Sequence, residues 1–235
     1  ASCVRACDVV ITMVGFPDDV REVYMDEGGI FAHAREGQLL IDMTTSSPKL
    51  AQELAQLGRE KDLRVLDAPV TGGDAGAREG TLTILIGGRE EDAKAAWPLF
   101  EAMGRHIHHC GEAGCGQHMK LANQIMIAGA LSGVSEAAAY IQKQGMDPQE
   151  MIDDLKAGAA GSRQLELLGP KMVRHDFAPG FFVKHFIKDM RLADAEAKED
   201  GLQLNVLQTV LDNFEQLAEE GHADDGTQCL ITRYL

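Results

Sequence analysis

Residues 114–124 read GCGQHMKLANQ, and the chain continues as IMIAGALSG. Upstream of this stretch, short apolar runs alternate with helical patterns, whereas downstream of it no strand pattern occurs. If the stretch is helical, Lys120, Asn123 and Gln124 stand at i, i+3 and i+4 and share one face. A cation and two carboxamides on one face suit either a solvated surface or a site that binds a carbonyl oxygen.

The segments upstream of this stretch have the pattern of an α/β domain. Several of the expected strands are continuous Val, Ile and Leu runs, as in strands that are buried on both faces of a mainly parallel sheet. Helical patterns separate them, and this alternation predicts a doubly wound sheet. The expected strands are 8–15, 38–44, 64–70, 81–88 and 106–110, and the expected helices are 18–26, 48–61 and 90–103.

The segments downstream predict an all-helical domain. The first helix is long, and small residues such as Gly129 and Gly133 permit the close approach of another helix. We therefore expect an α/β domain over residues 1–112 and a helical domain over residues 113–235, with the boundary near residues 111–116. The expected helices are 115–144, 148–157, 162–175, 184–200 and 205–220, with a short segment at the C-terminus.

Composition excludes some classes of partner. The chain has 235 residues, of which 45% are hydrophobic, and 22 basic against 37 acidic residues give a net charge of −15. This charge repels nucleic acids and anionic membrane surfaces. No run of 18 apolar residues and no signal peptide is present. The five cysteines, an odd number without a secretion signal, indicate reduced thiols and a cytoplasmic protein.

Two stretches place hydroxyls and glycines after expected strands. DMTTSSP (42–48) puts hydroxyl groups at the carboxyl end of a strand, where open α/β sheets bind ligands, although an ordinary helix N-cap has the same pattern. Thr71, Gly72 and Gly73 follow another strand and leave bare N–H groups that could face a carboxylate. The alternative for this second stretch is a glycine-rich turn between two strands.

Two lysines are candidates for chemistry. Lys120 opens a helix of small residues close to the domain boundary, where partial desolvation would lower its pKa and make it a proton donor near neutral pH. Lys188 lies on the basic side of an amphipathic pattern over 181–201, where it could bind an anionic ligand while Asp189 orients a neighbour. The alternative for both lysines is a solvated surface.

Histidines and cysteines cluster at 106–118, in HIHHCGEAGCGQH. Their spacing matches no zinc pattern, and strand alternation puts His108 and His109 on opposite faces. We therefore expect no metal site, and a zinc hydrolase is the least favoured interpretation.

Taken together, five motifs in order resemble the 3-hydroxyisobutyrate dehydrogenase and related β-hydroxyacid dehydrogenase family, which includes tartronate and succinic semialdehyde reductases. The motif KDMRLA favours the semialdehyde-reductase branch. The resemblance implies a Rossmann-type domain, a helical domain of the 6-phosphogluconate dehydrogenase type joined by a long interdomain helix, and a nicotinamide cofactor, NAD or NADP. The motifs are DVVITMVGFPDDV, DMTTSSP, DAPVTGGDAGAREGTLTILIGG, GCGQHMKLANQ and FIKDMRLA.

The resemblance also implies a role for each candidate residue. Lys120 matches the catalytic lysine, and Asn123 with Gln124 matches an amide pair that is Asn-Asn in many members. Gln124 is longer than the Asn it replaces, and Gly15 stands where the family has proline. The substrate carboxylate would be bound by Thr71, Gly72 and Gly73, and the cofactor would be contacted by Val14, Gly15, Thr45 and Lys188.

The glycine fingerprint of a dinucleotide-binding sheet, Gly-x-Gly-x-x-Gly, does not occur in residues 1–110. The resemblance implies that it lies upstream of residue 1, which would make residues 1–112 the C-terminal part of the Rossmann domain. The position that separates NAD from NADP would lie upstream as well.

The expected function is hydride transfer between a nicotinamide cofactor and a small β-hydroxyacid or semialdehyde, in a homodimer or homotetramer. In this hypothesis, Lys120 stabilises and protonates the carbonyl oxygen, and the amide pair orients it. The alternative is a non-catalytic fragment that dimerises or binds the cofactor.

Overall fold

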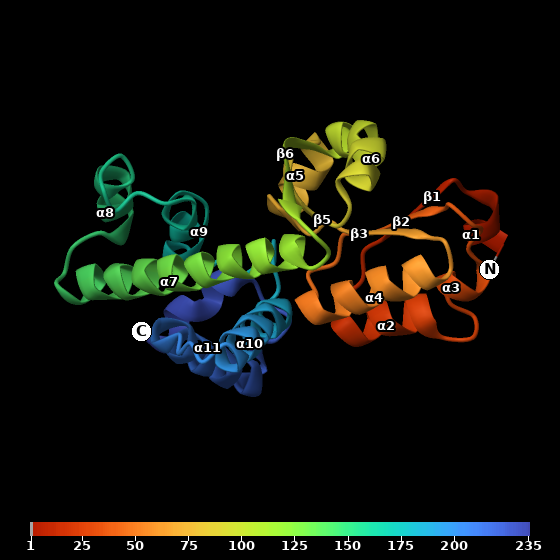
Figure 1. Ribbon diagram of the computed structural model, residues 1–235. Helices are drawn as coiled ribbons and strands as arrows, with labels where there is room; N and C mark the ends of the chain where they lie inside the picture. Colours follow the sequence, from red (N-terminus) through yellow and green to blue (C-terminus); the bar gives the residue numbers. More distant parts are fainter. Residues whose placement is uncertain (1) are drawn as a thin grey trace. The chain divides into compact units, whose positions relative to one another are not determined.

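The computed structural model describes residues 2–235 and contains two compact units, which divide between Leu121 and Ala122 (Figure 1). The boundary expected near residues 111–116 precedes this division by about two helical turns. The difference arises because the first turns of α7 (Cys115–Lys143) are hydrogen-bonded to the sheet of the first unit.

The first unit is an α/β structure whose main elements follow the expected alternation. The helices that were not expected are α1, α3 and α5, which are all short. The strands are β1 (Val9–Thr12), β2 (Leu39–Asp42), β3 (Arg64–Asp67), β4 (Val70–Thr71), β5 (Leu82–Gly87) and β6 (Gly104–Gly111), and the helices are α1 (Ser2–Ala6), α2 (Pro17–Met25), α3 (Ile30–His33), α4 (Pro48–Glu60), α5 (Gly73–Glu79) and α6 (Glu90–Met103).

The six strands form one mixed sheet. Strands β1, β2 and β3 are parallel neighbours, so their carboxyl ends, at Thr12, Asp42 and Asp67, meet at one edge. Strand β5 runs antiparallel to β3 and β4, and β6 runs parallel to β5. The sheet is therefore less uniformly parallel than the apolar runs alone indicated.

Both faces of the sheet are covered, which explains the continuous apolar runs. In β2, Leu39 and Ile41 face a core that includes Phe100 of α6, whereas Leu40 faces the opposite core, which includes Tyr24 of α2. Successive strand residues point to opposite faces, so the first three residues of this strand are apolar, whereas Asp42 at its end is buried with hydrogen-bond partners. Figure 1 shows α2 and α4 on one side of the sheet and α6 on the other.

The second unit contains the rest of α7 and the remaining helices, as expected. Its core includes an edge-to-face pair between Phe186 of α10 and Phe214 of α11, whose ring centroids are 5.2 Å apart. The other elements are α8 (Pro148–Leu155), α9 (Arg163–Val173), α10 (Val183–Glu199), α11 (Asn205–Leu217), a π-helical turn η1 (Ala218–His222) and a 3₁₀ segment η2 (Thr227–Arg233).

Helix α7 is 29 residues long, and by length and composition alone it could cross a membrane. Core helices of soluble proteins pass the same test, so this property carries little weight. In the present fold, its first turns are bound to strand ends, and residues such as Leu131 further along are buried.

Candidate active site

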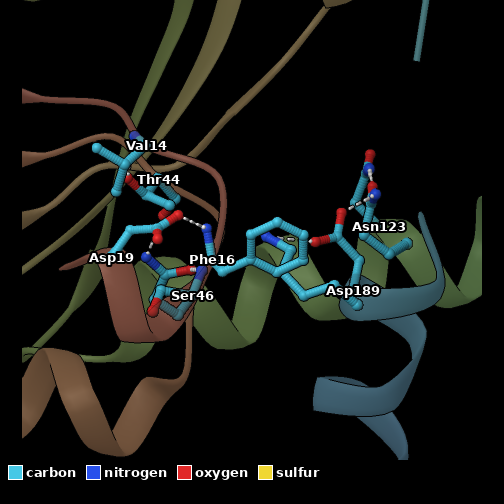
Figure 2. A network of polar contacts seen from close by, with 10 residues as sticks. Val14, Phe16, Asp19, Thr44, Ser46, Asn123 and Asp189 are labelled. Atoms are coloured by element: carbon cyan, nitrogen blue, oxygen red, sulfur yellow. Dashed lines mark hydrogen bonds and ion pairs between the residues drawn. The ribbon is translucent and has the colours of Figure 1, made fainter. Parts of the chain in front are cut away.

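The loops that follow β1 and β2 are joined at the carboxyl edge of the sheet. The N–H of Val14 donates to the hydroxyl of Thr44, with 3.0 Å between Val14 N and Thr44 Oγ1 (Figure 2). Phe16 is the N-cap of α2, and its N–H donates to the Asp19 carboxylate at 2.8 Å. Val14 and Gly15 are thus held between a strand end and a helix start, where parallel sheets bind ligands.

A buried carboxylate, Asp42, organises these two loops. Its Oδ1 accepts hydrogen bonds from the Thr12 hydroxyl at 3.0 Å and from the Thr44 N–H at 3.2 Å. Burial raises the pKa of Asp42 to about 6, although the hydrogen bonds from Thr44 and Thr12 act in the opposite direction. The hydroxyls of Thr12 and Tyr24 are 3.1 Å apart, and burial raises the pKa of Tyr24 as well.

A second buried carboxylate, Asp67, holds the start of α7. Its two oxygens accept from the N–H groups of Gly114 at 2.8 Å and of Gln117 at 3.0 Å. A carboxylate here satisfies N–H groups that a helix start leaves without partners, and it interacts favourably with the helix dipole. Gly116 is required for this approach, because a Cβ there would lie 2.7 Å from Asp67 Oδ2. Burial raises the pKa of Asp67 despite these hydrogen bonds.

The side chain of Gln117 joins α7 to the loop after β2. Its Oε1 accepts from the Ser46 N–H at 2.9 Å, and its Nε2 donates to the Thr44 carbonyl at 2.7 Å. Thr45 lies between these two peptide groups and is partly exposed, whereas Thr44 and Ser46 are buried.

Lys120 lies one turn beyond Gln117 on α7, and its residue exposure is only 7%. This burial excludes the alternative that Lys120 is a solvated surface lysine, and it is consistent with the interpretation as a desolvated lysine. Its role in proton transfer stays a prediction.

The glycine-rich stretch forms a strand end and a short helix. Thr71 ends β4 opposite Thr83 of β5, and α5 begins at Gly73. Gly72 and Gly73 are exposed and have φ values of 134° and 66°, which favour glycine. The sequence alternatives for this stretch, a carboxylate site or a simple turn, both omit helix α5. Gly80 ends that helix in the left-handed conformation.

The other predicted residues form a polar chain in the second unit. Asn123 Nδ2 donates to Gln124 Oε1 at 2.7 Å, and Gln124 Nε2 donates to Asp189 Oδ2 at 2.6 Å (Figure 2). Asp189 Oδ1 lies 2.9 Å from Lys188 Nζ. Gln124 and Asp189 are each 1% exposed, so both atoms of the Gln124 amide are engaged inside the protein.

The histidine and cysteine cluster lies mainly on β6. His109 Nε2 is 2.7 Å from the carbonyl oxygen of Gly88. Within residues 2–235, no group of three or more His, Cys, Asp or Glu side chains is arranged to hold a metal ion.

Comparison with known proteins connects this geometry to a family. Residues 1–111 match the NAD binding domain of 6-phosphogluconate dehydrogenase, and residues 114–234 match the NAD-binding domain of NADP-dependent 3-hydroxyisobutyrate dehydrogenase. The chain belongs to the 3-hydroxyisobutyrate dehydrogenase family. Members of this family are oxidoreductases that use NAD or NADP, so the cofactor class expected from the sequence is confirmed.

The relatives include both characterised and uncharacterised members. The uncharacterised oxidoreductase YkwC of Bacillus subtilis is 48% identical over 98% of this chain and 80% of its own length. The 2-hydroxy-3-oxopropionate reductase of Escherichia coli is 38% identical over 92% of this chain and 74% of its own length. A solved structure of Mycobacterium tuberculosis 3-hydroxyisobutyrate dehydrogenase with L-serine is 31% identical, with a TM-score of 0.88 over 99% of this chain and 81% of that chain.

The sequence interpretation named the ligand-facing candidates but missed the residues that hold them. The signal in the sequence was that most of these residues lie inside an expected strand or within two residues after one. The missed residues are Thr12, Asp42, Thr44, Ser46, Asp67 and Gln117.

Proposed function

We propose that this protein interconverts a small β-hydroxyacid and its semialdehyde, and that Lys120 exchanges the proton of the reacting oxygen. The observation that carries the proposal is the burial of Lys120 one turn beyond Gln117, whose side chain binds the loop of Thr45 at the carboxyl edge of the sheet. A buried ammonium there can stabilise negative charge on a carbonyl oxygen and then protonate that oxygen.

The residues at this edge fit a nicotinamide cofactor. Ser46 Oγ is buried and has no hydrogen-bond partner among the described residues, and Gly15 brings bare backbone to the edge. Val14, Gly15 and Thr45 would hold the nicotinamide half, and Lys188 is a further proposed contact of the cofactor. A bound nicotinamide supplies hydride to the carbonyl carbon, or accepts it in the reverse direction.

The substrate would be oriented by groups with distinct roles. The Thr71–Gly73 backbone would bind the carboxylate, and Asn123 would bind the reacting oxygen. Gln124 would act through Asn123, because its own amide is engaged by Asn123 and Asp189. In the oxidation direction, the neutral Lys120 amine would take the proton from the hydroxyl.

Two kinds of related protein guide the choice of substrates. A relative in Escherichia coli is a 2-hydroxy-3-oxopropionate reductase, and one in Pseudomonas aeruginosa is an NAD-dependent L-serine dehydrogenase. We therefore propose three-carbon and four-carbon substrates that carry a carboxylate in addition to the reacting hydroxyl or aldehyde group.

The test is a steady-state assay of the full-length protein with each cofactor. Reduction of tartronate and succinic semialdehydes with NADH or NADPH, and oxidation of L-serine and 3-hydroxyisobutyrate with NAD or NADP, should be followed at 340 nm. Turnover of at least one pair supports the proposal. Absence of turnover, together with no quenching of Trp97 fluorescence by NADH or NADPH at millimolar concentration, would instead support the non-catalytic alternative.

An oligomer is the proposed working state. Met126 and Tyr140 on α7 and Val206 on α11 are 76%, 64% and 67% exposed in the single chain, and an interface between copies could bury them. Light scattering after size exclusion should show a homodimer or homotetramer, and a monomer at micromolar concentration would contradict this.

A further inference from the structure

We propose that Gln117 is a positioning residue that fixes the backbone at Thr45 relative to the helix that carries Lys120. This inference rests on the proposed function for its catalytic consequence, but its structural part can be tested without turnover. Gln117 is 0% exposed, and its amide makes both of its hydrogen bonds to backbone groups.

The geometry of these bonds is that of a parallel strand. In a pair of parallel strands, the C=O of a residue accepts from the N–H of the residue after its partner. The N–H of the same residue donates to the C=O of the residue before its partner. The Gln117 amide accepts from Ser46 N and donates to Thr44 O, the two groups that flank Thr45. The side chain therefore takes the place of a strand residue opposite Thr45, three residues beyond the end of β2.

The residue type follows from this requirement. One acceptor and one donor must lie side by side on the same planar group, and among side chains only a carboxamide or a protonated carboxylic acid provides both in that arrangement. An ionised Glu offers acceptors alone, and Met offers no donor.

Gln117 is also anchored through its own backbone. Its N–H donates to Asp67 Oδ2 at 3.0 Å, and the other oxygen of Asp67 accepts from Gly114 at 2.8 Å. The first turn of α7 is thus tied to the ends of both β2 and β3. Because Lys120 follows Gln117 by three residues on this anchored helix, its position relative to Thr45 is set inside the first unit.

A buried glutamine at the other end of β2 provides a matched control. Gln38 is 4% exposed, its Oε1 accepts from Arg35 N at 2.9 Å, and its Nε2 donates to the carbonyls of Val4 at 2.8 Å and Cys7 at 2.7 Å. Gln38→Met removes the same kind of backbone contact from the same unit, but it lies just before β2 instead of after it.

The first measurement is hydrogen exchange, which needs no activity. In Gln117→Met, the Ser46 amide should exchange at least about 10-fold faster than in the wild type, because its acceptor is lost. In Gln38→Met, the Ser46 amide should keep its wild-type rate. Unchanged Ser46 exchange in Gln117→Met would overturn the proposal whatever the enzyme's activity.

The second measurement is kinetic. We expect Gln117→Met to lower kcat by about 100-fold, because a small misplacement of reacting groups is enough for such a loss. The KM for the semialdehyde should change much less, and Gln38→Met should keep kcat within about 2-fold of wild type. Equal losses of kcat in the two variants at equal Tm would overturn the proposal.

A third variant gives a signature that lost stability alone cannot produce. In Gln117→Glu, the protonated acid again offers one donor and one acceptor, so kcat relative to wild type should rise as pH falls from 8 to 6. Dividing the kcat of Gln117→Glu by the wild-type kcat at each pH removes the pH dependence that both proteins share. The ionisable groups nearby are Asp42 and Asp67 at the strand ends and His118 and Lys120 on α7. A ratio that does not change with pH would contradict the proposed positioning role of the Gln117 amide.

Discussion

Two buried glutamines seven residues apart on α7 bind different kinds of partner. Gln117 binds the backbone of the loop after β2, whereas Gln124 binds the side chains of Asn123 and Asp189. Backbone partners fix the course of the chain, because moving them requires a loop to move. Side-chain partners fix only the orientation of charged groups and amides. Each of these side chains can rotate once its neighbour is lost.

Lys120 lies between the two glutamines, and its removal should have the largest effect. We expect Lys120→Ala to lower kcat by at least about 1000-fold, equivalent to about 4 kcal/mol, since the proton and the positive charge are both lost. Lys184→Ala is the control, because Lys184 is exposed and pairs with Asp224 at 2.6 Å. Near-normal turnover in Lys120→Ala would remove the lysine from the mechanism.

The charged partner of Gln124 should matter mainly for stability. Asp189→Ala removes the buried carboxylate that Lys188 and Gln124 both contact, and we expect a loss of about 3 kcal/mol in the free energy of unfolding. Urea denaturation followed by circular dichroism measures it. Asp194→Ala on the same helix removes an ion pair with the more exposed Lys198 and should cost less. Equal losses would show that the pair with the less exposed Lys188 stabilises the fold no more than the pair with the more exposed Lys198.

The next largest loss of stability is expected from removal of Asp67, whose carboxylate accepts from the N–H of Gln117. Asp67→Ala leaves the N–H groups of Gly114 and Gln117 without their acceptor, and we expect a loss of about 2 kcal/mol. Asp74→Ala at the start of α5 is the control, because the Asp74 carboxylate is exposed. Denaturation curves for the two variants should separate clearly, and coincident curves would mean that Asp67 is not an effective cap.

The smallest effect should be a pH dependence from Asp42. Its pKa is raised to about 6 in the folded protein, so the folded state binds more protons than the unfolded state between pH 4 and 6. Stability contributed by this group is therefore lost as pH rises through 6. Relative to Asp42→Asn, the wild type should lose about 1 kcal/mol of unfolding free energy between pH 5 and 8. A constant difference between the two proteins would show that Asp42 is ionised throughout this range.

Much of the architecture is encoded locally. Apolar runs predict most of the strands, because a strand covered on both faces places apolar side chains in both cores. The helical periodicity and the lack of strand patterns predict the second unit. The short helix α5 was missed because the glycines of its sequence, GDAGARE, indicate a turn more strongly than a helix.

By itself, the sequence determined that Lys120, Asn123 and Gln124 share a stretch of one helix, because helical spacing depends only on neighbouring residues. Only the tertiary structure decided what Gln117, Gln124 and Asp67 bind, since their partners are 71, 65 and 47 residues away along the chain. Which donor meets which acceptor across such distances depends on how strands and helices pack, and no local pattern contains that information.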